Sequence, residues 1–221
     1  MIDIFNYLKN CDYPGRGILT GFCEEGRVIA YFIMGRSLNS ANRVFRKEKD
    51  VLFTRAYDES KLADPSLIIY NAIRDFNDLT IVTNGDQTDT IHDFLMEGKS
   101  FEEALQSREY EPDAPNYTPR ISALINDEGY KIAILKRKEE ECERLFYVYE
   151  RRDGIGHFIS TYDHDGNPLP SFSKEPLEFR IVESFEDFSA HLWQSLNEKN
   201  RVSLYVRMNE KEIIFNRNEG D

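Results

Sequence analysis

Two arginines and several amide and hydroxyl side chains are concentrated in one short segment. Residues 36–43 read R-S-L-N-S-A-N-R and follow the apolar run at residues 28–34. A guanidinium offers a planar fork of donors that suits a phosphate or a carboxylate, and an asparagine amide can both donate and accept at the edge of a heterocycle. Arg36, Asn39 and Arg43 are therefore candidate ligand-binding residues, although a solvated loop would explain the same composition.

Two other polar segments could meet a ligand. Two glycines flank Arg16 just before an apolar run, and glycine allows a ligand to approach the backbone closely. Residues 83–90 place Asn84, Asp86 and other small polar side chains before an expected helix, whose N-terminus presents free N–H groups and a positive dipole end. Capping of that helix by Asp86 is the simpler explanation of the second segment.

Several known kinds of site are excluded by their motifs. Neither the phosphate-binding pattern G-x-x-x-x-G-K-[ST] nor the dinucleotide-binding pattern G-x-G-x-x-G occurs. The 3 cysteines are widely spaced and the 4 histidines form no H-x-x-x-H or H-x-E pair, which argues against a zinc site or a disulfide framework. Asp163 begins a stretch that resembles a calcium loop, but Pro168 and Lys174 replace the required glycine and acid, so we expect a hairpin turn at residues 165–167. We expect no metal and no cofactor.

Composition and charge limit the partners of the chain. Its net charge of −12 at pH 7 argues against duplex nucleic acid and against an anionic membrane surface. No run approaches the roughly 18 to 20 apolar residues of a spanning helix, and no signal-peptide pattern opens the sequence, so we expect a cytoplasmic protein. With 40% hydrophobic residues and no linker-like segment, residues 1–221 should form a single domain. A homo-oligomer is compatible with this composition.

The apolar pattern predicts many strands and few helices. Strands are expected in a hairpin around residues 18–19 and 28–34, and then at residues 51–57, 67–73, 79–82, 121–125, 131–135, 145–149, 157–162, 177–182, 202–206 and 213–215. Helices are expected after Asp86, from the capping box between Ser100 and Glu103, and from Ser184 to about Leu196. A parallel sheet would need a helix after every strand, so an α+β layered sandwich fits better.

Two further segments are of interest. Residues 111–119 contain three prolines, which exclude a helix and predict a rigid extended loop of the kind that often carries function. Tyr70 and Asn71 lie in an apolar run, where packing in the core with a satisfied hydroxyl is the ordinary role of a tyrosine.

Six motifs in register resemble those of the archaeal-type IMP cyclohydrolase family. They are Y-P-G-R-G from Tyr13, R-S-L-N-S-A-N-R from Arg36, Y-N from Tyr70, T-N-G-D-Q-T-D-T-I from Thr83, Y-E-P-D from Tyr110 and T-P-R-I-S-A from Thr118. The resemblance implies a four-layered αββα sandwich like that of the N-terminal-nucleophile hydrolases. It also implies a cyclohydrolase that closes 5-formamidoimidazole-4-carboxamide ribonucleotide (FAICAR) to IMP with loss of water, the last step of de novo purine biosynthesis. Because the chain begins Met1-Ile2, attack by an N-terminal nucleophile is not expected.

The same resemblance implies which residues act. Catalytic groups map to Arg43, Tyr70 and Glu111: Glu111 and Tyr70 would transfer protons, and Arg43 would polarise an oxygen or hold the nucleotide. Candidates for the 5′-phosphate are Arg16, Arg36 and Arg120, and candidates for the ribose or base are Asn39, Asn71, Asn84, Asp86 and Asp113.

Two other functions remain open from the sequence. A related amidohydrolase acting on a purine or aminoimidazole nucleotide could use the same pocket. A non-catalytic protein could instead hold a purine nucleotide with Arg16 and Arg43. The presence of both Tyr70 and Glu111 favours an enzyme, because binding alone needs no proton-transfer pair.

Overall fold

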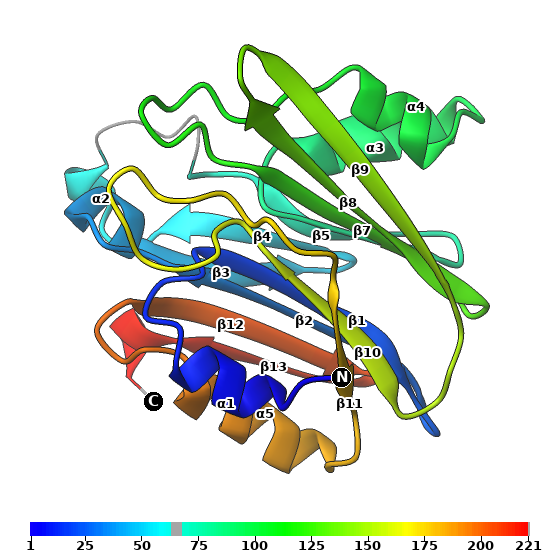
Figure 1. The fold of residues 1–221 in the computed structure, drawn as a ribbon. Coiled ribbons are helices and arrows are strands. Elements are labelled where there is room, and N and C mark those ends of the chain that lie inside the picture. Colours follow the sequence, from blue (N-terminus) through cyan, green and yellow to red (C-terminus); the bar gives the residue numbers. More distant parts are fainter. Residues whose placement is uncertain (63–67, 221) are drawn as a thin grey trace.

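Two antiparallel sheets stack face to face in the computed structural model, which describes residues 1–62 and 68–220 (Figure 1). Sheet A has the order β11-β10-β1-β2-β12-β13 and sheet B the order β3-β4-β5-β6-β7-β8-β9. The strands of sheet A are β1 (Arg16–Cys23), β2 (Gly26–Met34), β10 (Ile155–Ser160), β11 (Leu177–Arg180), β12 (Arg201–Met208) and β13 (Lys211–Asn216). Those of sheet B are β3 (Arg43–Glu48), β4 (Val51–Ala56), β5 (Asn71–Phe76), β6 (Leu79–Thr83), β7 (Arg120–Ile125), β8 (Gly129–Lys138) and β9 (Glu141–Glu150). The predicted α+β class with packed antiparallel sheets is confirmed.

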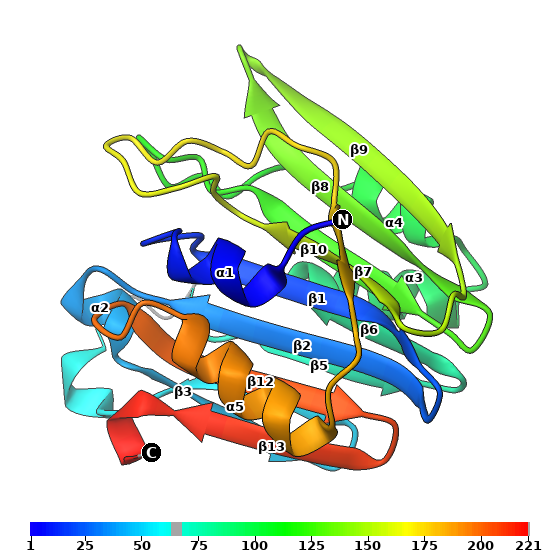
Figure 2. The same ribbon diagram turned by 60° about the horizontal axis from the view of Figure 1, so that its bottom comes forward.

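Helices cover the outer face of each sheet, so the layers follow the order helix, sheet, sheet, helix (Figure 2). They are α1 (Ile4–Lys9), α2 (Leu38–Ala41), α3 (Gln87–Met96), α4 (Phe101–Gln106) and α5 (Phe185–Ser195), with short 3-10 turns η1 (Glu59–Lys61) and η2 (Arg217–Glu219). One apolar core lies between the sheets, a second joins sheet A to α1 and α5, and a third joins sheet B to α3 and α4. Alternate residues along each strand supply opposite faces: Ile18 enters the core between the sheets and Leu19 the core under α1 and α5.

Local signals for several elements are confirmed. The β1–β2 hairpin turns at residues 24–25, and the predicted capping box opens α4, where Ser100 Oγ accepts from the Glu103 backbone N–H at 3.1 Å. Ser184 caps α5 in the same way, accepting from the backbone N–H of Asp187 at 3.1 Å. No helix in the described part of the chain is long and apolar enough to cross a membrane.

One predicted strand needs correction, and several elements were not predicted. The strand expected at residues 67–73 begins only at Asn71, and residue 67 lies outside the described residues. Strand β3 was not predicted, because it is an edge strand whose polar residues outnumber Val44 and Phe45. Helix α1 was also missed, because six residues with two buried side chains, Ile4 and Leu8, are too few to show a helical period.

The hairpin turn expected at residues 165–167 is also wrong. These residues belong to a long loop between β10 and β11, in which Tyr162 and Ser171 form only an isolated bridge. Pro168 and Pro170 lack the N–H groups that a strand ladder requires, so pairing does not extend through this segment.

Loops gather at one end of the sandwich. In Figures 1 and 2 the loops at residues 107–119 and 161–176 extend to the same end as α2, on the left of both views. Tight turns at residues 24–25 and 77–78 close the other end. The end that carries the long loops is therefore where polar side chains from both sheets can meet.

Candidate active site

The starts of several strands bring the candidate catalytic side chains to this end of the sandwich. Arg16 begins β1, Arg43 begins β3 and Arg120 begins β7. Tyr70 lies immediately before β5, and Glu111 comes from the loop between α4 and β7. Burial disfavours the charged form of Arg16, but nearby Glu111 and Tyr70 outweigh it and raise the pKa of Arg16 well above its ordinary value. The structure thus brings together Arg16, Arg43, Tyr70 and Glu111 from four separate segments.

Two guanidinium groups, that of buried Arg43 and that of largely buried Arg16, have donor atoms without partners. Arg43 has no exposed surface; its Nε donates to the Ser40 carbonyl at 2.8 Å and its Nη2 to the Met34 carbonyl at 3.1 Å. Among the described residues, Nη1 of Arg43 and Nε of Arg16 have no hydrogen-bond partner. Burial and the positive charge of Arg16 lower the pKa of Arg43 below its ordinary value. A buried unpaired donor costs about 1–3 kcal/mol, so this pair of cations is suited to an anionic or strongly accepting ligand.

Tyr70 is held next to a second tyrosine that the sequence did not mark as functional. Its hydroxyl lies 2.7 Å from the hydroxyl of Tyr31 on β2, and its backbone N–H donates to Thr54 Oγ1 at 3.0 Å. Burial raises the pKa of Tyr31 well above its ordinary value. In the sequence, Tyr31 lies within an apolar run that predicts a core strand. The pairing of β1 with β2 sets Tyr31 opposite Ile18, two residues after Arg16. Only this strand register shows that Tyr31 lies near Arg16 and Tyr70.

Glu111 is a buried carboxyl group among cations. Its side chain is 2% exposed, and its Oε2 lies 3.8 Å from Arg16 Nη2. Burial raises the pKa of Glu111 above its ordinary value, although Arg16 and Arg120 oppose the rise. Gly85 leaves room for Arg120 beside Glu111, because a Cβ there would lie only 2.7 Å from Arg120 Nη1. A carboxyl with a raised pKa in a buried site is suited to exchange protons near neutral pH.

The loop that carries Glu111 is closed on itself. Asp113 accepts from the Thr118 backbone N–H at 2.6 Å and from its hydroxyl at 2.5 Å, and Glu111 donates its N–H to the Thr118 carbonyl at 2.9 Å. The Thr118 hydroxyl also lies 2.5 Å from that of Tyr162, another residue that the sequence did not mark. The loop at residues 111–119 is non-helical as predicted, but it folds back as a turn and is not extended, because Asp113 ties its two ends together. Asp113 thus positions Glu111.

Arg120 links the segment before Glu111 to the start of α3. Its Nη1 donates to Asp86 Oδ1 and to Gln87 Oε1, both at 2.7 Å, and its Nε donates to the Glu109 carbonyl at 2.8 Å. The Asp86 carboxylate also accepts from Arg108 at 2.5 Å. Asp86 occupies the N-cap of α3, yet within the described structure its side chain makes no capping hydrogen bond. Its carboxylate instead joins α3 to the start of β7.

Two asparagines proposed as ligand-binding residues have structural partners. Asn84 Oδ1 accepts from the Ile121 backbone N–H at 2.8 Å, and Asn84 Nδ2 donates to the Pro119 carbonyl at 2.9 Å. Asn71 Nδ2 donates to Asp89 of α3 at 2.9 Å. Asn71 therefore faces the helix layer outside sheet B, and the structure does not bring it into the group formed by the catalytic candidates.

Two residues of the arginine segment lie at the rim of this end. Arg36 is exposed; it pairs with Asp165 of the long loop, and its guanidinium lies 4.8 Å from the centre of the Tyr13 ring. Asn39 is partly exposed on α2, and its Oδ1 has no hydrogen-bond partner among the described residues. Both could reach a ligand that extends outward from the buried arginines.

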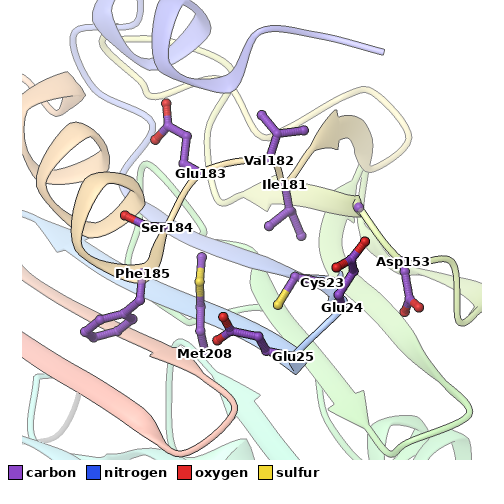
Figure 3. A pocket seen from close by; sticks show the side chains of 11 residues that line it. Cys23, Glu24, Glu25, Asp153, Ile181, Val182, Glu183, Ser184, Phe185 and Met208 are labelled. Atoms are coloured by element: carbon purple, nitrogen blue, oxygen red, sulfur yellow. The ribbon is translucent and has the colours of Figure 1, made fainter.

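A cleft of about 520 Å³ lies elsewhere, beside the β1–β2 turn and the start of α5 (Figure 3). It is lined by Cys23, Glu24, Glu25, Asp153, Gly154, Ile181, Val182, Glu183, Ser184, Phe185 and Met208. These described lining residues include four acids and no lysine or arginine, so this cleft would repel a phosphate. The chemistry of the buried arginine group, and not the size of this cleft, identifies the candidate active site.

Comparison with known proteins gives a consistent result. The sequence model of a family described as "IMP cyclohydrolase-like protein" matches residues 13–213. A protein named IMP cyclohydrolase from Methanopyrus kandleri is 32% identical over 186 residues, which cover 80% of this chain and 90% of that protein. One with the same name from Methanosphaera stadtmanae is 31% identical over 159 residues, covering 69% and 75%. A third, from Methanocaldococcus jannaschii, is 27% identical over 155 residues, covering 68% and 73%.

Proposed function

This chain belongs to the family of IMP cyclohydrolase-like proteins, and from that premise we propose that it closes FAICAR to IMP with loss of water. One observation in the structure carries the assignment of the site: two arginines with buried, unpartnered donor atoms lie near a buried carboxyl and a tyrosine hydroxyl. The cations supply what an anionic nucleotide needs, and the two proton-transfer groups supply what ring closure needs.

The layers of the fold support the same proposal. Helices on the outside of two packed antiparallel sheets are the arrangement that the N-terminal-nucleophile hydrolase fold would give, and we propose that fold here. We also propose that residues 1–221 act as one domain, since the family match extends over residues 13–213 and both sheets contribute to the site.

Ring closure sets the roles of the three catalytic candidates. The carboxamide nitrogen of FAICAR attacks the formyl carbon, and Glu111 accepts a proton from that nitrogen as the C–N bond forms. Tyr70 donates a proton to the formyl oxygen, and Arg43 stabilises the negative charge that develops there. Protonated Glu111 returns its proton to the hydroxyl, which leaves as water, while the formamide nitrogen gives its proton to the Tyr70 phenolate, so both groups regain their starting states. Arg16, beside Glu111, and the exposed Arg36 then hold the phosphorylated end of the substrate.

The test is a spectrophotometric assay of FAICAR with purified protein in the presence of a chelator. IMP formation by the wild-type chain is expected. Tight binding of IMP without turnover would replace the proposal with a nucleotide-binding role, and turnover of another purine or aminoimidazole nucleotide would replace it with a related amidohydrolase reaction.

Replacement of Arg43 by lysine should lower kcat by about 10² to 10³, the usual cost of removing one donor to a developing oxyanion. Lysine keeps the positive charge but lacks the planar guanidinium. In Arg43 that group donates to two backbone carbonyls and leaves Nη1 free to donate to a ligand. Arg46→Lys is the matched control, because Arg46 lies on the same strand and pairs with Glu219 away from the site. Near-normal turnover by Arg43→Lys would remove Arg43 from the chemistry.

The pH profile of kcat/KM should have an acidic limb set by Glu111. A base acts only when deprotonated, and burial raises the pKa of Glu111 above 4.5, so the midpoint of this limb should lie above that of an ordinary glutamate. Asp113 contributes to this rise through its negative charge. Asp113→Asn should therefore move the midpoint to lower pH. A limb that does not move, or one at or below the ordinary value, would contradict the role of Glu111 as base.

A further inference from the structure

Two buried tyrosine hydroxyls meet beside the arginines, and this contact defines a role for the tyrosine that has no assigned function. We propose that Tyr31 is a positioning residue: it donates its hydroxyl proton to Tyr70 and thereby directs the Tyr70 proton toward the substrate. The inference rests on the proposed cyclohydrolase function for its catalytic consequence, but its geometric part can be tested without substrate.

Tyr31 is anchored in the middle of sheet A. It lies on β2 between Ile18 of β1 and Tyr205 of β12, and it has no exposed surface. Its ring contacts that of Phe45 from sheet B, with centroids 5.5 Å apart. Tyr70 is 6% exposed. Tyr31 therefore lies deeper, and Tyr70 lies nearer to solvent.

The available donors and acceptors indicate which of the two hydroxyls donates the hydrogen bond. The two oxygens lie 2.7 Å apart, and either hydroxyl could donate. Within the described residues, Tyr70 is the hydrogen-bond partner of the Tyr31 hydroxyl. Arg16 and Arg43 also approach Tyr31, but a guanidinium only donates and cannot accept its proton. If Tyr70 donated to Tyr31, the Tyr31 proton would lack an acceptor in a residue with no exposed surface, which is the costlier arrangement; in the opposite one the free proton belongs to Tyr70, which is 6% exposed.

The favoured direction prepares Tyr70 for proton donation. Its oxygen accepts from Tyr31, so its own O–H is free to point at the formyl oxygen. After that transfer Tyr70 is a phenolate, and the hydrogen bond from Tyr31 becomes one to a charged acceptor, which is stronger than a bond between neutral groups. Tyr31 keeps its proton throughout, because burial raises its pKa well above the ordinary value. Tyr31 thus acts through Tyr70 and does not need to touch the substrate.

The kinetic test is a double-mutant cycle with FAICAR as substrate. Tyr31→Phe should lower kcat by about 10- to 100-fold, the worth of a hydrogen bond to a charged group, and leave KM nearly unchanged. In a Tyr70→Phe background the same substitution should have no further effect on kcat. Tyr205→Phe is the matched control: it is the cross-strand neighbour of Tyr31, is equally buried, and donates instead to Glu212 at 2.8 Å. It should retain wild-type kcat.

Neutron diffraction from crystals of the deuterated wild-type chain tests the geometry directly. Deuterium on Tyr31 should lie between the two oxygens, and that on Tyr70 should point away from the Tyr31 oxygen. Deuterium of Tyr70 pointing at Tyr31 would overturn the proposal, whether or not FAICAR is turned over. So would equal losses of kcat from Tyr31→Phe in both backgrounds, or an effect on KM alone, since either indicates packing only. Absence of IMP formation by the wild type, with the expected neutron result, would refute the cyclohydrolase function and leave the Tyr31–Tyr70 geometry standing.

Discussion

Replacement of Glu111 by glutamine is expected to lower kcat for IMP formation by about 10² to 10⁴, the usual contribution of a general base. The amide has the same shape as the carboxyl group but cannot accept a proton from the attacking nitrogen. The side chain is 2% exposed and lies 3.8 Å from Arg16, so solvent or another base has little access to replace it. The measurement is the rate of IMP formation at saturating FAICAR.

The control for this change is Glu109→Gln. This substitution removes the same charge two residues earlier in the chain, at an exposed side chain. Glu109 contacts Arg120 through its backbone carbonyl and not through its carboxylate, so the substitution keeps that contact. The control should retain nearly full activity, and both variants should unfold at temperatures close to that of the wild type. A Glu111→Gln enzyme with nearly normal kcat would show that another group removes the proton.

Loss of the Tyr70 hydroxyl should have an effect of similar size. Tyr70→Phe keeps the ring that packs in the core between the sheets but removes the proton proposed for the formyl oxygen, so kcat should fall by about 10² to 10⁴. KM should change much less, because the arginines still hold the nucleotide. Single-turnover measurements would show whether the loss lies in ring closure or in product release.

Tyr130→Phe provides the comparison for Tyr70. Tyr130 is buried in the same core, and its hydroxyl lies 2.6 Å from His157 Nδ1, apart from the group that contains Arg16 and Arg43. This substitution removes a buried hydrogen bond, so it should lower the free energy of unfolding by about 0.5–1.5 kcal/mol while leaving turnover intact. If Tyr130→Phe and Tyr70→Phe reduced kcat equally, the Tyr70 effect would be one of stability and not of chemistry.

The elements predicted well are those with local causes. Ser100 and Glu103 satisfy each other's backbone groups at the start of α4 whatever surrounds them, and the β1–β2 hairpin follows from two apolar runs around a three-residue polar break. The elements that were missed are short or depend on their neighbours: α1 and α2 have local caps at Asp3 and Ser37, but they span only 6 and 4 residues. Strand β3 is polar apart from Val44 and Phe45, and it exists because β4 pairs with it along its whole length.

The same distinction separates the site residues. Arg43, Tyr70 and Glu111 were marked by motifs that resemble a family, and their types alone specify a cation, an acid and a base. Their neighbours were not marked, because burial and proximity depend on pairing between distant strands. Tyr31 reaches Tyr70 across the two sheets, and Tyr162 reaches Thr118 from a loop 44 residues later in the chain.

By itself, the sequence determined the class of the fold, the family and the chemical types in the site, since composition, period and motif are properties of the chain alone. Tertiary structure decided which of those types lie together. Strand alternation turned Asn71 outward to Asp89 while Tyr70 faced Tyr31, so adjacent residues were assigned to different faces of one sheet. Packing also left donors of Arg16 and Arg43 buried and unpaired. The binding capacity proposed for the site would thus depend on desolvation, because these donors lose their water only when the two sheets pack together.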